Sequence, residues 1–227
     1  SGYYANYSAN KYALGLNLGS PRAIDIVKRM VAWADLVTEN FTPGTMERLG
    51  LGYEALARIK PDIVHFSTSM VGRGGPNSKL PGFGAVLSSL SGLTGITGWP
   101  DRDPTNPYGA YTDFIAPRFA LAAILAALDH RRRTGIGQHI DMSQLESALQ
   151  FIAPLLLDRA NNGREAGRTG NRHEAAAPHG AFPCRGEDRW VTITCMSDAH
   201  WLALRRVLAD PDWMRAERFA TLLGPWA

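Results

Sequence analysis

The stretch ADLVTENFTPGTMERLG, residues 34–50, joins a short apolar strand to a polar loop and then to a helix. Residues 36–38 are the expected strand, and the loop 39–44 follows its carboxyl end. Upstream, Ser20-Pro21 predicts a helix start, because serine caps helices and proline is favoured at their first position. Downstream, the β-branched run 62–68 predicts a second strand. This alternation predicts parallel βαβ units, in which ligands bind beyond the carboxyl ends of the strands.

The rest of the chain extends this pattern. Residues 14–18 alternate like a short strand, and residues 138–142 predict another strand. Between them, residues 113–133 form a long, almost wholly apolar segment, which predicts a central buried helix. Residues 143–159 predict a helix kinked at Pro154. The fold class is therefore α/β with a parallel sheet.

The composition of the sequence changes near its last third. Residues 161–178 are polar and glycine-rich, as a linker would be. A hairpin formed by 181–185 and 190–195 follows, and helices fit 198–208 and 211–222. We therefore expect a large α/β domain over 1–160, a linker over 161–178, and the start of a smaller α+β domain over 179–227.

Composition excludes several classes of protein. The 227 residues include 24 basic and 21 acidic side chains, a net charge of +3 that suits a small anionic ligand better than nucleic acid. Two cysteines are too few for a disulfide scaffold; they favour a reducing, cytoplasmic compartment or are simply two buried small apolar residues. No apolar run approaches the roughly 18 residues of a membrane span, so we expect no membrane partner. The six histidines show no metal-ligand spacing, and no dinucleotide fingerprint is present.

Asp113 is the carboxylate with the most suggestive position, between a Gly/Pro-rich loop and the apolar helix. One interpretation is a helix N-cap, for which aspartate is a preferred residue. The other is a nucleophile or an acid–base group, because helix N-terminal amides keep a carboxylate ionised and able to attack an acyl carbon. The two interpretations are compatible.

Two loops lie at expected strand ends. Arg48 follows the loop 39–44 and is either a solvated surface residue or a phosphate contact. Gly72, Gly74 and Gly75 follow the strand 62–68, where glycine lets the backbone approach a ligand closely. An ordinary turn explains these glycines equally well.

Several stretches together resemble the class III CoA-transferase family, the formyl-CoA/carnitine-CoA transferase (CaiB/BaiF-like) group. They arrive in the family's order and span nearly the whole chain. They are NK at 10–11 with LGLNL at 14–18, the 34–50 stretch, TD at 112–113 with AL at 127–128 and RRTGIGQ at 132–138, and GNRH at 170–173 leading to APHG at 177–180.

This resemblance implies a Rossmann-like large domain, an interlocked homodimer and a specific reaction. Asp113 would attack an acyl-CoA thioester and then carry CoA as an aspartyl thioester until a carboxylate substrate accepts it. Asn40, Phe41, Arg48 and Lys11 match positions that line the CoA pocket. CoA would be a co-substrate, with no permanently bound cofactor and no metal.

The chain also departs from the family. Members commonly carry Asp where this chain has Gly84 and often Gln where it has Ser88, and a basic residue of some members falls on Ser69. Related α-methylacyl-CoA racemases use a His-Asp pair where Phe83-Gly84 stands here, which weakens a racemase assignment because that reaction needs a second base.

The ends differ too. The family's first βαβ segment and its long C-terminal return are missing, so the resemblance implies a partial chain. Racemase-like epimerisation and a non-catalytic CoA-binding or assembly role are the alternatives to transfer.

Overall fold

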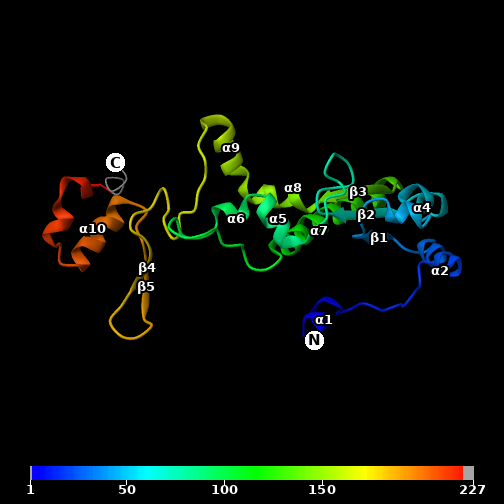
Figure 1. The fold of residues 1–227 in the computed structure, drawn as a ribbon, viewed down its shortest axis with the longest axis horizontal. Helices are drawn as coiled ribbons and strands as arrows, with labels where there is room; N and C mark the ends of the chain where they lie inside the picture. The colour runs from blue at the N-terminus through cyan, green and yellow to red at the C-terminus, as the bar shows by residue number, and fades with distance from the viewer. Residues whose placement is uncertain (1, 222–227) are drawn as a thin grey trace. The chain divides into compact units, whose positions relative to one another are not determined.

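The computed structural model describes residues 2–221 (Figure 1). The chain divides into two compact units, Ser1–Ser91 with Gly109–Phe151, and Gly92–Tyr108 with Ile152–Ala227. Each unit is described by itself below.

The first unit is built on a three-stranded parallel sheet. Its strands β1 (Leu36–Glu39), β2 (Val64–Ser69) and β3 (Gln138–Ser143) lie in that order, with β2 in the centre. Val37 is in register with His65, which is in register with His139. The predicted parallel α/β arrangement is therefore confirmed for this unit, with each strand within two residues of its expected bounds.

Short helices supply most of the core on one side of the sheet. They are α2 (Pro21–Val31), α3 (Thr45–Arg48) and α4 (Tyr53–Ile59), and α1 (Gly2–Tyr7) precedes them. Helix α2 starts at Pro21 as predicted, although the Ser20 side chain makes no capping hydrogen bond. The core cluster combines Val31, Met46 and Leu56 of these helices with Leu51 and Ile63 of the adjoining turns.

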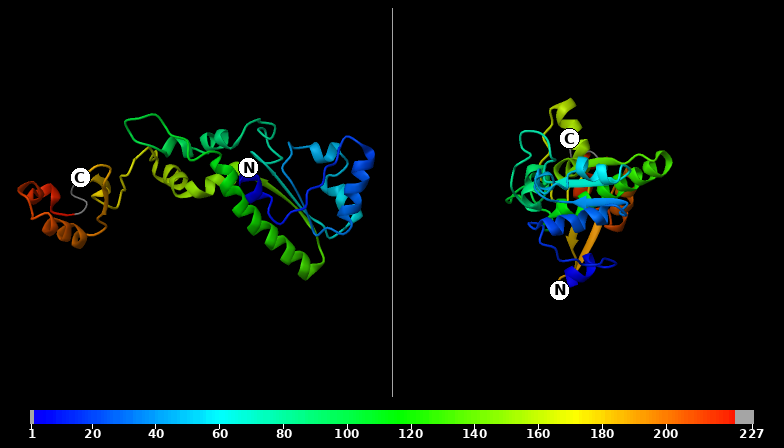
Figure 2. Two further views of the ribbon diagram at one scale, coloured as in Figure 1. Left: turned by 90° about the horizontal axis from the view of Figure 1, so that it is seen from below. Right: turned by 90° about the vertical axis from the view of Figure 1, so that its right-hand side faces the viewer.

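The long helix α7 (Tyr111–Thr134) packs against β2, β3, α5 (Gly84–Leu90) and α8 (Gln144–Leu149). The strands lie between α7 and the α2/α4 helices (Figure 2). Only Thr112, Ile115, Ala116 and Ala127 of α7 are buried, while the side chains of Leu121 and Leu125 are more than half exposed. The expectation of a central buried helix is wrong for this chain, because an all-round apolar composition does not determine which faces have partners.

Helix α7 also corrects the expectation about membrane spans. Within residues 2–221 it is the one helix long and apolar enough, by length and composition, to cross a bilayer. Counting uninterrupted apolar residues overlooked it, because Asp113 and Arg118 break the run without making the average polar. Core helices of soluble proteins pass the same test but are mostly buried, whereas 22% of the apolar window of α7 is buried.

The RRTGIGQ motif is where α7 turns into β3. Gly135 ends the helix with a positive φ of 73°, a conformation that favours glycine. A Cβ on Gly137 would lie 2.2 Å from the carbonyl oxygen of Ile63, so only glycine allows β3 to approach the backbone preceding β2 so closely. Arg131 then ties this end of the helix to Asp35 and Asp62 by ion pairs of 2.8 and 2.6 Å.

Two further expectations are corrected. Residues 14–18 form no strand, and residues 11–17 have no regular structure. The predicted helix 143–159 is divided into α8, a 3₁₀ turn η1 (Gln150–Ile152) and α9 (Ala153–Asn162). Pro154 lies in the first turn of α9, where its missing N–H costs nothing.

The second unit contains α6 (Leu93–Ile96), α9 and an antiparallel pair, β4 (His179–Pro183) and β5 (Trp190–Thr194), followed by α10 (Asp198–Val207). The predicted hairpin and the first predicted helix are confirmed. The expected helix 211–222 is instead two 3₁₀ turns, η2 (Asp212–Arg215) and η3 (Glu217–Phe219), and residue 222 lies outside the described residues. The Trp201 Nε1–H donates to the Phe219 carbonyl at 2.8 Å, and both cysteines are free thiols.

Candidate active site at the carboxyl edge of the sheet

The loops at the carboxyl ends of β1 and β2 form the candidate site. After β1, the buried Glu39 carboxylate accepts a hydrogen bond of 2.7 Å from the Phe41 N–H, which bends the chain into the Asn40–Pro43 segment. Gly44 then takes a φ of +87° and begins α3. After β2, Gly72 also has a positive φ, of 83°, and starts the long loop that leads to α5.

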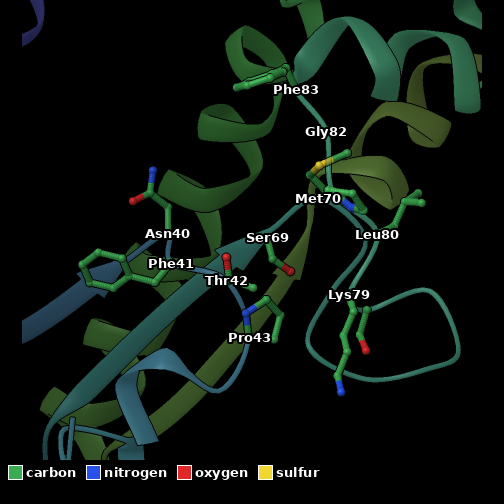
Figure 3. A pocket seen from close by; sticks show the side chains of 12 residues that line it. Asn40, Phe41, Thr42, Pro43, Ser69, Met70, Lys79, Leu80, Gly82 and Phe83 are labelled. Atoms are coloured by element: carbon green, nitrogen blue, oxygen red, sulfur yellow. The ribbon is translucent and has the colours of Figure 1, made fainter. Parts of the chain in front are cut away.

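A cavity of about 430 Å³ lies between these two loops. One wall is formed by Asn40, Phe41, Thr42 and Pro43, and the opposite wall by residues 78–83. Figure 3 shows Asn40 and Phe41 across from Leu80, with Ser69 between them at the end of β2. The structure thus brings two of the predicted CoA-pocket residues, Asn40 and Phe41, into one cavity.

A second cavity, of about 490 Å³, includes Asn40 as well. It lies over Thr38, Phe66 and Met142 and is bounded by the Ala116–Ile124 part of α7. Lys11, a third predicted residue, lines it, and the Lys11 ammonium donates to the Tyr7 carbonyl at 2.6 Å. Asn40 is therefore the residue that the two cavities share.

Arg48 and Asp113 line neither cavity. The Arg48 guanidinium donates to Thr45 Oγ1 at 2.8 Å and folds back over Gly44 on an exposed surface. Its charge is therefore open to solvent and to any anion that reaches the outside of the Asn40–Pro43 loop.

Asp113 lies against the start of α5. A Cβ built on Gly84 would be 2.8 Å from Asp113 Oδ2 and 2.6 Å from the Ala110 Cβ. The Gly84 carbonyl accepts a hydrogen bond of 3.2 Å from Thr112 Oγ1, which fixes α5 to the first turn of α7, and one of 3.1 Å from Ser88 Oγ within α5 itself. Because Phe83 of the first cavity directly precedes Gly84, the carboxylate lies beside that end of the cavity wall.

The N-cap interpretation of Asp113 is wrong. Helix α7 begins two residues earlier, at Tyr111, and the Asp113 backbone N–H already donates to the Ala110 carbonyl at 2.9 Å. Asp113 is exposed, yet neighbouring atoms displace enough water to raise the pKa of its carboxyl above the usual value. A carboxylate with a raised pKa is more basic, and so a stronger nucleophile when ionised.

Sequence reasoning noted Phe83 of the opposite wall only as a departure from related racemases, and it identified neither the rest of that wall, including Lys79, nor the charged residues next to the loops. Arg73 pairs with Glu39 at 3.2 Å and with Glu47. Their positions in the sequence were the available signal for these charged residues. Glu39 ends the first strand, and Arg73 lies among the glycines that follow the second strand.

The sheet beneath the site holds two stacked histidines. The rings of His65 and His139 lie 4.9 Å apart, and His139 Nε2 hydrogen-bonds to Ser67 Oγ at 2.9 Å. His65 is fully buried without a hydrogen-bond partner, and this burial lowers its pKa to about 4. Among residues 2–221, no group of three or more His, Cys, Asp and Glu side chains is arranged to hold a metal.

Comparison with known proteins supports one family. The model of CoA-transferase family III matches residues 1–224. The chain is 35% identical over 218 residues to an acetyl-CoA:oxalate CoA-transferase of Acetobacter aceti, covering 96% of this chain and 56% of the relative. It is 34% identical to the succinyl-CoA:glutarate CoA-transferase of Mus musculus, covering 93% and 48% respectively.

A solved structure agrees with these relatives. The crystal structure of a CaiB/BaiF family protein from Brucella suis superposes with a TM-score of 0.83 at 31% identity, covering 94% of this chain and 56% of that one. The chain thus spans about half the length of the curated relatives it matches. On these grounds, the chain belongs to CoA-transferase family III.

Proposed function

We propose that the protein transfers CoA from an acyl-CoA thioester to a carboxylic acid, with Asp113 as the covalent carrier. Family membership supports the reaction class. The observation that carries the assignment of Asp113 is its closeness to Gly84, which follows Phe83 at the end of the first cavity.

The proposed reaction begins with attack of an Asp113 carboxylate oxygen on the thioester carbonyl. The C–S bond breaks, CoA leaves as a thiolate, and Asp113 becomes a mixed anhydride with the donor acyl group. The thiolate then attacks the Asp113 carbonyl, which releases the donor as a free carboxylate and leaves an aspartyl-CoA thioester. The acceptor carboxylate reverses these two steps, so that no thioester energy is lost to water.

The surroundings of Asp113 suit this role. Partial removal of water raises its pKa and leaves it with fewer hydration contacts to break before attack. In contrast, the exposed Asp129 on the same helix is paired with Arg132 and Arg133, which lower its pKa. The pKa is therefore raised at Asp113, as suits a nucleophile, and lowered at Asp129, as is typical of a surface ion pair.

We propose that CoA is held by Asn40, Phe41, Arg48 and Lys11. Asn40 and Phe41 offer an amide and an aromatic face to the first cavity, and Lys11 contributes a cation to the second. Arg48 is suited to a phosphate at the outer surface of the loop. The named relatives act on oxalate and glutarate, which supports a short dicarboxylate as the acceptor.

We also propose that the protein works as a cytoplasmic homodimer. The exposed apolar side chains of α7, including Phe119, Leu121 and Leu125, support a covering partner surface. Light scattering coupled to size-exclusion chromatography tests this assembly, and a monomer at micromolar concentration contradicts it.

The test of the carrier is hydroxylamine trapping. Hydroxylamine converts an activated aspartyl group to a hydroxamate, which peptide mass spectrometry locates. After incubation with succinyl-CoA we expect modification at Asp113, none in Asp113→Asn, and normal modification in the control Asp129→Asn. Full transferase turnover by Asp113→Asn would refute the proposal.

One observation favours a second candidate, a CoA-binding protein without catalysis: Asp113 lines neither cavity. In that case calorimetry shows CoA binding by the wild type, and Asp113→Asn binds equally well, while no hydroxamate forms at any acyl-CoA concentration.

A further inference from the structure

Arg73 connects three elements at the carboxyl edge of the sheet. Its Nη1 donates to Glu39 Oε1 at 3.2 Å, and its Nη2 donates to Glu47 of α3. Its backbone N–H donates to Asp141 Oδ2 of β3 at 3.0 Å. The side chains of Arg73 and Glu39 are only 16% and 3% exposed, so this connection lies largely out of solvent.

The connection continues to the cavity. Glu39 uses one carboxylate oxygen for Arg73 and the other for the Phe41 N–H. Phe41 and its neighbours are one wall of the first cavity, and the loop that carries Arg73 runs on to the opposite wall at residues 78–83. A single guanidinium therefore links the two walls through one intervening carboxylate.

The charges around Arg73 argue against a role as a ligand for phosphate. Three carboxylates, those of Glu39, Glu47 and Asp141, surround this one cation through its side chain and backbone. An incoming phosphate would meet a net negative group, and its attraction to the guanidinium would be opposed by the carboxylates already bound there. Arg73 is suited to hold the loops rather than the substrate.

We propose that Arg73 is a positioning residue, which through Glu39 sets the place of the Asn40–Pro43 wall and so controls the affinity for CoA. This inference rests on the proposed function, because CoA is taken to bind at that wall. Without Arg73, the buried Glu39 carboxylate loses its charged partner, and the turn at Phe41 loses its fixed acceptor.

The chain offers a matched control in Arg131. Arg131 is 17% exposed and also bridges two carboxylates, Asp35 and Asp62, but it does so at the opposite end of the same sheet. Replacing either arginine by glutamine removes a cation of equal exposure that holds two acids. Only the change at Arg73 touches a loop of the cavity.

The experiment measures CoA binding by calorimetry, thermal unfolding, and the rate of Asp113 modification at saturating succinyl-CoA. For Arg73→Gln we expect CoA affinity to fall by about tenfold or more, with the modification rate at saturation changed less than about threefold. Arg131→Gln should lower the melting temperature less, because its partners Asp35 and Asp62 are 75% and 32% exposed, and it should leave CoA affinity unchanged. Arg73→Lys, which keeps one charged donor, should recover part of the affinity.

Glu39→Gln separates positioning from direct binding. If Arg73 positions the loop, Glu39→Gln weakens CoA binding as Arg73→Gln does, because both break the same connection. If Arg73 contacts a CoA phosphate, removing the competing carboxylate tightens binding, and the proposal is overturned. Equal CoA affinity in Arg73→Gln and Arg131→Gln also overturns it, whereas a wild type that binds no CoA contradicts the proposed function itself.

Discussion

Replacing Gly84 by alanine tests the placement of Asp113. The added Cβ would lie 2.6 Å from the Ala110 Cβ, 2.8 Å from Asp113 Oδ2 and 2.9 Å from the Ala110 Cα, whereas ordinary contacts begin near 3.4 Å. Rotation of Asp113 relieves only one of these contacts, because the other two involve Ala110. The start of α7 must therefore move by roughly half an ångström or more away from α5.

The effect on activity should exceed the effect on stability. A displacement of about 1 Å at a reacting group costs on the order of a hundredfold in rate, so we expect a loss of about ten- to a hundredfold in Asp113 modification. Overpacking costs about 1–3 kcal/mol, and the better helix propensity of alanine, worth about 1 kcal/mol in a helix interior, offsets less than that at Gly84, the first residue of α5. The variant should therefore remain folded.

The assay is the single-turnover rate of hydroxamate formation at Asp113, read by mass spectrometry at saturating succinyl-CoA. Gly95→Ala is the matched control, because Gly95 also lies in a helix and a Cβ there meets nothing within 4 Å. It should react at the wild-type rate. A Gly84→Ala protein that also reacts at the wild-type rate would refute the reasoning about this contact.

Three further substitutions have expected outcomes. Asp113→Asn should raise the melting temperature at pH 7, because the folded state raises the carboxyl pKa, and the gain should vanish as the pH falls to about the ordinary value of 3.8. His65→Phe should remove a pH dependence of the free energy of unfolding, measured in urea. In the wild type the unfolded state takes up a proton below pH 6.5 and the folded state only below about 4, so His65 should lower the free energy of unfolding by about 3 kcal/mol across that interval. An equal loss in the variant would contradict this. Gly137→Ala should destabilise by about 3 kcal/mol or more, since its Cβ meets the Ile63 carbonyl at 2.2 Å, whereas Gly74→Ala, with open space around it, should change urea stability by less than about 1 kcal/mol.

The parallel sheet could be predicted from local signals. Strands β1 and β2 are rich in β-branched or apolar residues, and β3 follows the glycines at 135 and 137, so these signals act within or directly beside each segment. Residues 14–18 alternate between apolar and other residues but form no strand. An alternating segment becomes a strand only where a neighbouring strand is available for hydrogen bonding. The burial of α7 depends on its partners in the same way.

The candidate site was predictable on one side only. The loop Asn40–Pro43 was found because it follows a strand at the edge where ligands bind. The opposite wall, residues 78–83, carries no motif and reaches the cavity through a long loop whose path no local rule determines. Asp113 was found, but its neighbour Gly84 appeared only as a departure from the family, and its closeness to Asp113 is visible only in the structure.

The most direct test of the central proposal follows the oxygen atoms. In the proposed reaction, glutarate labelled with ¹⁸O in its carboxylates attacks the aspartyl-CoA thioester, and the later C–O cleavage leaves one acceptor oxygen on Asp113. After a single turnover with succinyl-CoA, mass spectrometry of the peptide that contains Asp113 should therefore show one ¹⁸O in that carboxyl group. Formation of labelled glutaryl-CoA with no ¹⁸O in Asp113 would contradict covalent transfer through this residue.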